Sequence, residues 1–244
     1  MSSVEDRKPG RRARLRAQTT AEIKRIALEH MAEQGADAIS LRAIAREMDM
    51  SGSAIYSYFD TRDDLISELI GDVYTALVDA LEAARDAVPE DDPGGRITAW
   101  GEALRTWSLA NPQGFRLIHG DPVSGYRPPE GGPAPEAAKR ACLGLVGLIA
   151  AAWPTARDLQ DDPSARWSDF SEDFTAKVRA QDPDLPPAAV ALALRIWGRM
   201  HGPVALELHG HLGPQAHHPD RLYRRELQDL VRSLGLPVTR TLMV

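Results

Sequence analysis

Residues 40–62 carry two short apolar patterns separated by turn-forming residues, and this stretch limits the possible folds more than any other. The first pattern has apolar residues at the i, i+3, i+4 and i+7 spacing of an amphipathic helix, at Leu41, Ile44, Ala45 and Met48. Asp49-Met50-Ser51-Gly52 interrupts it, because these residue types favour turns and helix caps. A second stripe follows at Ala54, Ile55, Tyr58 and Phe59. Two short helices joined by a tight turn are typical of a helix-turn-helix.

The second of these helices has an outward face that fits a DNA groove. Small residues there would allow close approach to base edges, and we expect Ser51, Gly52, Ser53 and Ser57 to lie nearest the bases. Hydroxyl and guanidinium groups around them can donate to phosphates, and we assign this contact to Arg42, Tyr56, Tyr58 and Arg62. The same periodicity is also compatible with two ordinary helices in a helical core.

Three segments in this region carry a family resemblance. Leu41-Arg42-Ala43-Ile44-Ala45-Arg46, Ser51-Gly52-Ser53-Ala54-Ile55-Tyr56-Ser57-Tyr58-Phe59 and Arg62-Asp63-Asp64-Leu65-Ile66 resemble the DNA-binding domain of TetR-family transcriptional repressors, over about residues 19–70. The resemblance implies a short helical N-terminal domain and a larger all-helical domain that dimerises and binds an inducer. Arg62 stands where relatives often carry lysine, and arginine keeps the charge needed for a phosphate contact.

The charge distribution agrees with a DNA-binding N-terminus, although the net charge of the 244-residue chain is −6. Residues 1–62 contain 11 Lys+Arg and 9 Asp+Glu, whereas the remainder contains 18 and 26. The single cysteine, Cys142, excludes an intrachain disulfide and fits a reducing cytoplasm. No secretory signal is seen, and the longest apolar stretch, Ala141 to Trp153, is too short to span a bilayer. We therefore expect a soluble, cytoplasmic protein without a membrane partner.

We expect an all-α fold with an N-terminal helix-turn-helix domain joined to a larger dimerisation and ligand-binding domain. The expected divisions are a flexible basic arm at 1–18, the DNA-binding domain at 19–65, the regulatory domain at 66–236 and a tail at 237–244. The first helix should begin at Thr19 or Thr20 and end at Gly35. Later helices are expected at 62–85, 96–110, 112–119, 136–156, 164–181, 187–210 and 219–235. The arm is either a solvated tail or a segment that contacts the DNA backbone.

One further motif, Trp197-x-x-x-His201-Gly202, resembles the WHG subclass of C-terminal domains in TetR-like regulators. This resemblance covers roughly residues 95–210 and implies a dimer interface made by the last two helices. Pro203 should kink the helix near the carbonyl of Arg199.

A mostly apolar effector pocket between helices of the regulatory domain would use aromatic and histidine side chains. The candidates are Trp107, Phe115, His119, Trp153, Phe174, Trp197 and His201, with Glu207 as a further polar contact. For each of these residues ordinary core packing remains the alternative.

Other chemistry finds little support in the sequence. Five histidines fall within residues 201–218, but zinc sites use three or four converging ligands and the cysteine is distant, so we expect no metal and no cofactor. No Gly-x-Ser-x-Gly elbow or phosphate-binding loop indicates an enzyme. The sequence therefore predicts a homodimeric repressor that binds a pseudo-palindromic double-stranded DNA operator and is released by a small-molecule effector. The alternatives are a DNA-binding regulator without an inducer and, more remotely, a helical metal-binding module or enzyme.

Overall fold

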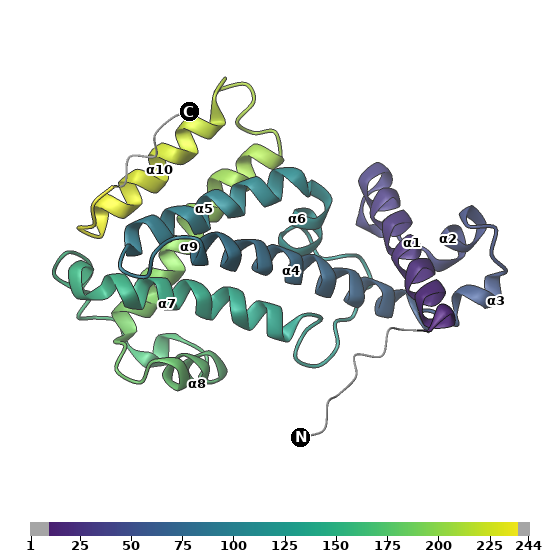
Figure 1. Cartoon of the computed structure of the whole chain (residues 1–244), viewed down its shortest axis with the longest axis horizontal. Coiled ribbons are helices and arrows are strands. Elements are labelled where there is room, and N and C mark those ends of the chain that lie inside the picture. The colour runs from purple at the N-terminus through teal and green to yellow at the C-terminus, as the bar shows by residue number, and fades with distance from the viewer. Residues whose placement is uncertain (1–9, 239–244) are drawn as a thin grey trace. The chain divides into compact units, whose positions relative to one another are not determined.

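The structure, a computed structural model, describes residues 10–238, and these residues form helices without any strand (Figure 1). In chain order the helices are α1 (Arg11–Gln34), η1 (Ala36–Ala38), α2 (Leu41–Glu47), α3 (Gly52–Ile55), α4 (Arg62–Asp86), α5 (Pro93–Ala110), α6 (Pro112–His119), α7 (Pro135–Gln160), η2 (Trp167–Asp169), α8 (Glu172–Gln181), α9 (Pro187–Leu208) and α10 (Pro219–Ser233). The all-α prediction is confirmed.

Helix contacts divide the chain into two compact units. The first unit combines the N-terminal part, through Val73, with Gln113–Pro133, and the second combines Tyr74–Pro112 with the chain from Ala134 onward. α4 begins in the first unit and ends in the second. We expected a single boundary between the two domains near residue 65. In the structure, α6 and the loop after it belong instead to the same unit as the N-terminal helices.

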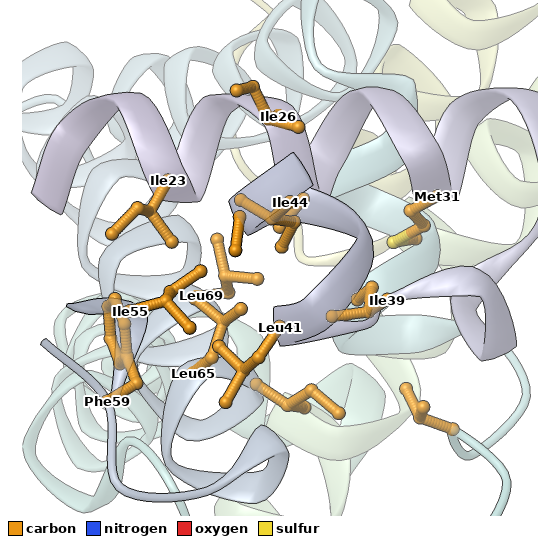
Figure 2. Packing of buried hydrophobic residues seen from close by; sticks show 14 of the residues in the cluster. Ile23, Ile26, Met31, Ile39, Leu41, Ile44, Ile55, Phe59, Leu65 and Leu69 are labelled. Atoms are coloured by element: carbon orange, nitrogen blue, oxygen red, sulfur yellow. The ribbon is translucent and has the colours of Figure 1, made fainter. Parts of the chain in front are cut away.

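The first unit is built around one apolar core, which Figure 2 shows from close by. Ile23 and Ile26 from α1 and Ile44 from α2 are almost fully buried in it. Ile55 and Phe59 from the second helical pattern enter the same core, with exposed fractions of 0% and 3%. Burial of several large side chains, at roughly 1.5–3 kcal/mol each, fixes which face of α3 points inward.

α6 and the segment after it are held to this core by polar and apolar contacts. Leu117 and Val123 belong to the buried cluster, and Tyr126 packs against it. The hydroxyls of Tyr126 and Ser67 lie 2.9 Å apart, so one donates to the other. These contacts explain why the Pro- and Gly-rich stretch between the helices expected at 112–119 and 136–156 belongs to the first unit.

In the second unit, close helix packing depends on two glycines. A Cβ on Gly101 of α5 would lie 2.5 Å from a methyl carbon of Leu227 in α10, and one on Gly144 of α7 would lie 2.7 Å from the ring of Trp100. The buried hydroxyl of Tyr223 donates to the Gly101 carbonyl at 2.9 Å. α5 and α10 therefore approach more closely than larger side chains would permit (Figure 1).

Several helix boundaries differ from the expected ones. α1 begins at Arg11, not at Thr19 or Thr20, because residues 11–18 are arginine, alanine, leucine and glutamine, which all favour helix. Residues 1–9 of the expected arm, and residues 239–244 of the expected tail, lie outside the described residues. α8 begins only at Glu172, since Ser171 caps it by accepting from the Phe174 N–H. α9, expected at 187–210, agrees closely with its expected range and runs from Pro187 through Pro203 to Leu208.

α7 is the one described helix whose length and composition would allow it to cross a membrane. One such helix is weak evidence for a membrane span, because core helices of soluble proteins meet the same criteria. α7 packs against α5, α8 and α9 in the second unit.

Candidate nucleic-acid interface

α2, the turn after it and α3 present the residues that the sequence assigned to DNA. Ser40 occupies the N-cap position of α2, but its side chain makes no capping hydrogen bond. Asp49, in the turn, has a φ of 53°, a left-handed conformation that aspartate tolerates better than most side chains. Ser51 caps α3, because its Oγ accepts from the Ala54 N–H at 3.2 Å.

The second helix is shorter than expected. α3 ends at Ile55, and residues 56–58 continue as turns in which Ser57 and Tyr58 donate to carbonyls three residues earlier. The inward and outward faces are nevertheless as predicted. Gly52, Ser53, Tyr56 and Ser57 are exposed, Ala54 and Tyr58 are half-buried, and Ile55 and Phe59 are buried. The outward face is therefore open to a groove.

Hydrogen bonds within the turn already occupy two of the four proposed base-contacting residues. The Ser57 hydroxyl donates to the Ala54 carbonyl at 2.7 Å, and the Ser51 hydroxyl is used by the cap. The Ser53 hydroxyl makes one contact, with the Ser51 hydroxyl at 3.2 Å. Tyr56 is 42% exposed, and its hydroxyl makes no hydrogen bond to any other described residue. Ser53 and Tyr56 are thus the side chains best placed to bind an external partner.

Two arginines of α2 flank this face. Arg42, in the first turn, and Arg46, in the last, are exposed and have no acidic partner among the described residues. Lys24 of α1 is instead paired with Glu68 and Asp72, at 2.8 and 2.7 Å. Exposed cations without acidic neighbours can neutralise phosphates without first breaking an ion pair. The sequence assignment included Arg42 but missed Arg46, which has the same helical surroundings.

Arg16 was expected in the flexible basic arm, but it lies in α1, which begins earlier than expected. Its guanidinium donates to the Ser57 carbonyl at 2.6 Å and lies 4.9 Å from the centroid of the Tyr58 ring. The first turns of α1, which carry exposed Arg11, Arg12 and Arg14, are thereby fixed beside the second helical pattern. No short motif marks this contact, because it joins residues 41 positions apart.

Arg62 is held within the first unit rather than directed freely outward. Its Nε donates to the Ile39 carbonyl at 2.8 Å, and Nη1 donates to the Ser124 carbonyl at 3.1 Å. Tyr58, another proposed phosphate contact, packs partly against the core and beneath Arg16. Both residues support the helix-turn-helix from inside, whatever further contact they make.

Comparison with known proteins fits this geometry. Residues 25–69 match the model of bacterial regulatory proteins of the tetR family, and residues 97–230 match the tetracyclin repressor-like C-terminal domain. HTH-type transcriptional regulator Rv1816 of Mycobacterium tuberculosis is 32% identical over 206 residues, which cover 84% of this chain and 86% of the relative. The chain belongs to the TetR family. It is a DNA-binding transcriptional regulator, as both the helix-turn-helix pattern and the Trp-His-Gly motif indicated.

Solved TetR-like structures share the fold. A regulatory protein, SCO4313, is 36% identical with a TM-score of 0.70, and the match covers 92% of this chain and all of that one. A tetR-family regulatory protein from Rhodococcus RHA1 is 19% identical with a TM-score of 0.60, over 90% and 98% of the two chains. At that identity the second likeness concerns the fold alone.

The second unit of this TetR-family chain has an apolar surface on its last two helices. Leu194, Trp197 and Leu206 of α9 are between 40% and 48% exposed, and Leu222 of α10 is 55% exposed. Gly198 and Gly202 lie between them on α9, and a Cβ on either would meet nothing within 4 Å. Large exposed apolar side chains beside a smooth glycine strip are typical of a surface that another helix covers.

The residues proposed for ligand binding are dispersed between the two units. Phe115 and His119 lie in the first unit, with ring centroids 5.1 Å apart, and Phe115 is fully buried. Trp197 and His201 lie on α9 of the second unit, with centroids 5.4 Å apart. Trp107 of α5, Trp153 of α7 and Phe174 of α8 are half-buried. Glu207 is bound by both donors of an Arg105 fork, at 2.6 and 2.8 Å.

A cleft of about 430 Å³ opens elsewhere in the second unit, between α4, α5, α7 and α8. None of the seven proposed ligand-binding residues is in its lining. Its lining consists of arginine, lysine, glutamate, glutamine, leucine, alanine and glycine residues and includes no aromatic ring. The aromatic and histidine residues that the sequence proposed for ligand binding therefore did not predict the position of this cleft.

Proposed function

We propose that this chain is a transcriptional repressor that binds double-stranded DNA through the outward face of α3 and the turn after it. The observation that carries the proposal is the contrast within residues 55–59, where buried Ile55 and Phe59 flank exposed Tyr56 and Ser57. This arrangement presents hydroxyls and small side chains to a DNA groove, while the buried residues hold α3 in place. Arg42 and Arg46 would bind phosphates on either side.

The residues proposed to contact DNA would act in two different ways. Ser53 and Tyr56 have groups available for bases or phosphates, and Gly52 lets the backbone approach the groove. Ser51, Ser57, Tyr58 and Arg62 would act mainly by fixing the position of this surface, since their polar groups or rings already have partners within the unit. Few side chains then read bases directly, so DNA shape would carry much of the specificity.

The apolar surface of α9 and α10 supports a homodimer. A second copy would cover Leu194, Trp197 and Leu222 and could approach closely along Gly198 and Gly202. A two-fold dimer presents two helix-turn-helix units related by the same axis, so its operator would be pseudo-palindromic.

Release from DNA would follow the binding of a small-molecule effector to the second unit. The effector must prefer one conformation of the protein, because a ligand with equal affinity for both states shifts nothing. The alternative is a regulator without an effector. The relatives are transcriptional regulators, which supports a cytoplasmic, non-enzymatic role.

Selection of bound duplexes from random DNA by the full-length protein tests this proposal. We expect enriched sites with two-fold symmetry and half-sites about one helical turn apart, or a multiple of this. A Ser53→Glu variant should enrich nothing, because it places a negative charge against phosphates, whereas Ser168→Glu, at an exposed position of the second unit, should behave as the parent. Failure to enrich any sequence would contradict DNA binding. A reporter gene behind the selected site then separates repression from activation.

A further inference from the structure

The cleft of the second unit is large enough for a small organic molecule, since ligand sites usually have volumes of about 300–1,000 Å³. Its α7 lining recurs every three or four residues from Glu136 to Ala151, so a single face of that helix forms the floor. The ends of α4 and α8 and the beginning of α5 supply the rest. All of these residues belong to one compact unit.

The charges in the cleft are mostly positive although the unit is acidic. Four of the six charged lining residues are basic, namely Arg85, Arg96, Lys139 and Arg140. Over residues 74–112 and 134–244 the sequence has 16 Lys+Arg against 20 Asp+Glu. Arg140 is already paired with Glu82 and Asp79. Arg85 is likewise paired with Asp86. The positive charge open to an anion in this concave site therefore comes from the other two cations, and low-dielectric walls would focus its field.

Two of these cations retain binding capacity. Lys139 is exposed and has no acidic partner among residues 10–238. Arg96 shares Asp86 with Arg85, at 3.1 and 2.6 Å, and its buried Nε–H has no acceptor in the described part of the chain. Unpaired buried donors are rare and call for an explanation. A carboxylate at the mouth of the cleft would give this guanidinium a second acceptor after a small rotation.

The remaining floor of the cleft is formed by aliphatic side chains and glycines. Leu143, Leu148 and Ala151 alternate with Gly144 and Gly147 along the same face of α7. The ring of Trp100 packs directly against Gly144. A nucleotide base would find few donors or free aromatic faces here, whereas an alkyl chain would lie against this surface and gain about 0.8 kcal/mol per buried methylene.

We propose that this cleft is the effector site and that it binds an amphipathic carboxylate, with the carboxylate at Arg96 and Lys139 and the apolar chain along α7. This inference rests on the proposed function only in its claim that ligand binding changes the affinity for DNA. Binding itself can be measured without DNA.

Isothermal titration calorimetry of the full-length protein with decanoate, 1-decanol and acetate tests the proposal. Decanoate should bind one site per chain with a dissociation constant below about 1 mM. Decanol, which lacks the charge, and acetate, which lacks the chain, should each bind at least about tenfold more weakly. Equal binding of decanol, or no saturable binding of decanoate, would overturn the proposal.

Lining variants locate the site. Lys139→Gln should weaken decanoate binding by about tenfold, and Ala151→Phe should abolish it by filling the apolar floor. Arg157→Gln is the matched control, since it removes an exposed charge from the same helix outside the cleft. Lys139 is exposed and has no ion-pair partner in the described part of the chain, so its variant should fold even if Ala151→Phe does not. Unchanged binding by Lys139→Gln would overturn the proposed site.

Decanoate should also lower the affinity of the parent protein, but not of Lys139→Gln at the same concentration, for a selected DNA site. Binding of decanoate without a change in DNA affinity would overturn the effector role. Failure of the unliganded protein to bind DNA would instead contradict the proposed function and leave the calorimetric result standing.

Discussion

The carboxylate of Asp37 accepts a hydrogen bond from the backbone N–H of Ser124 at 2.8 Å, across 87 residues of sequence. The carbonyl of the same Ser124 accepts from Arg62, whose Nε also binds the Ile39 carbonyl. Ser124 is therefore bonded through both backbone groups to elements of the helix-turn-helix region. A movement of this loop would change the positions of η1 and the start of α4 within the first unit.

Replacement of Arg62 by lysine separates a structural role from a phosphate contact. Lysine keeps the charge but cannot bridge the Ile39 and Ser124 carbonyls with a planar fork. We expect Arg62→Lys to lower the free energy of unfolding by about 1–3 kcal/mol, as measured by urea denaturation. Arg42→Lys, at an exposed position, should leave stability unchanged. Unchanged stability in Arg62→Lys would show that its two hydrogen bonds contribute little.

The phosphate contacts of α2 should appear in the salt dependence of DNA binding. Arg42→Gln and Arg46→Gln should each reduce the slope of log affinity against log salt concentration by about one, because each releases one counterion fewer. Fluorescence anisotropy with a labelled operator measures this slope. Arg25→Gln is the control in the same unit, since Arg25 is already paired with Glu22 and Glu29. An equal loss of slope in all three variants would argue against specific contacts by α2.

Gly52 offers a test in which stability and DNA affinity should move in opposite directions. A Cβ at this position meets nothing within 4 Å, so Gly52→Ala should fold normally and gain up to about 1 kcal/mol from the better helix propensity of alanine. DNA affinity should fall by about tenfold or more, equivalent to 1.4 kcal/mol, if the backbone lies against a groove floor. Thermal unfolding and anisotropy titrations measure the two effects.

The control for this test is Gly213→Ala, in the second unit, where a Cβ would make an ordinary contact at 3.6 Å. That variant should change neither property by much. Full DNA affinity in Gly52→Ala would place the groove contact elsewhere on the first unit.

The local parts of the fold could be predicted from sequence because they depend on neighbouring residues. The buried and exposed faces of residues 52–59 follow from helical periodicity, with Ile55 and Phe59 buried and Ser53, Tyr56 and Ser57 exposed. The contacts of Ser124 could not be predicted, because a Pro- and Gly-rich loop carries no periodicity that would show which helices it packs against. The cleft was missed for a similar reason, since its lining comes from four helices and from residue types that also occur on ordinary surfaces.

His201 should make the stability of the second unit depend on pH. Burial, and to a smaller extent nearby His209, lower the pKa of His201 below its ordinary value of 6.5. The unfolded chain then binds a proton near that value while the folded chain does not, so the free energy of unfolding falls as pH drops below about 6.5 and levels off below the folded pKa. Urea denaturation at fixed protein concentration, between about pH 8 and pH 5, measures this loss.

His201→Gln should lose less stability over this pH range than the parent, whereas His217→Gln, at an exposed position, should lose as much. A parent-like loss in His201→Gln would assign the pH dependence to other groups.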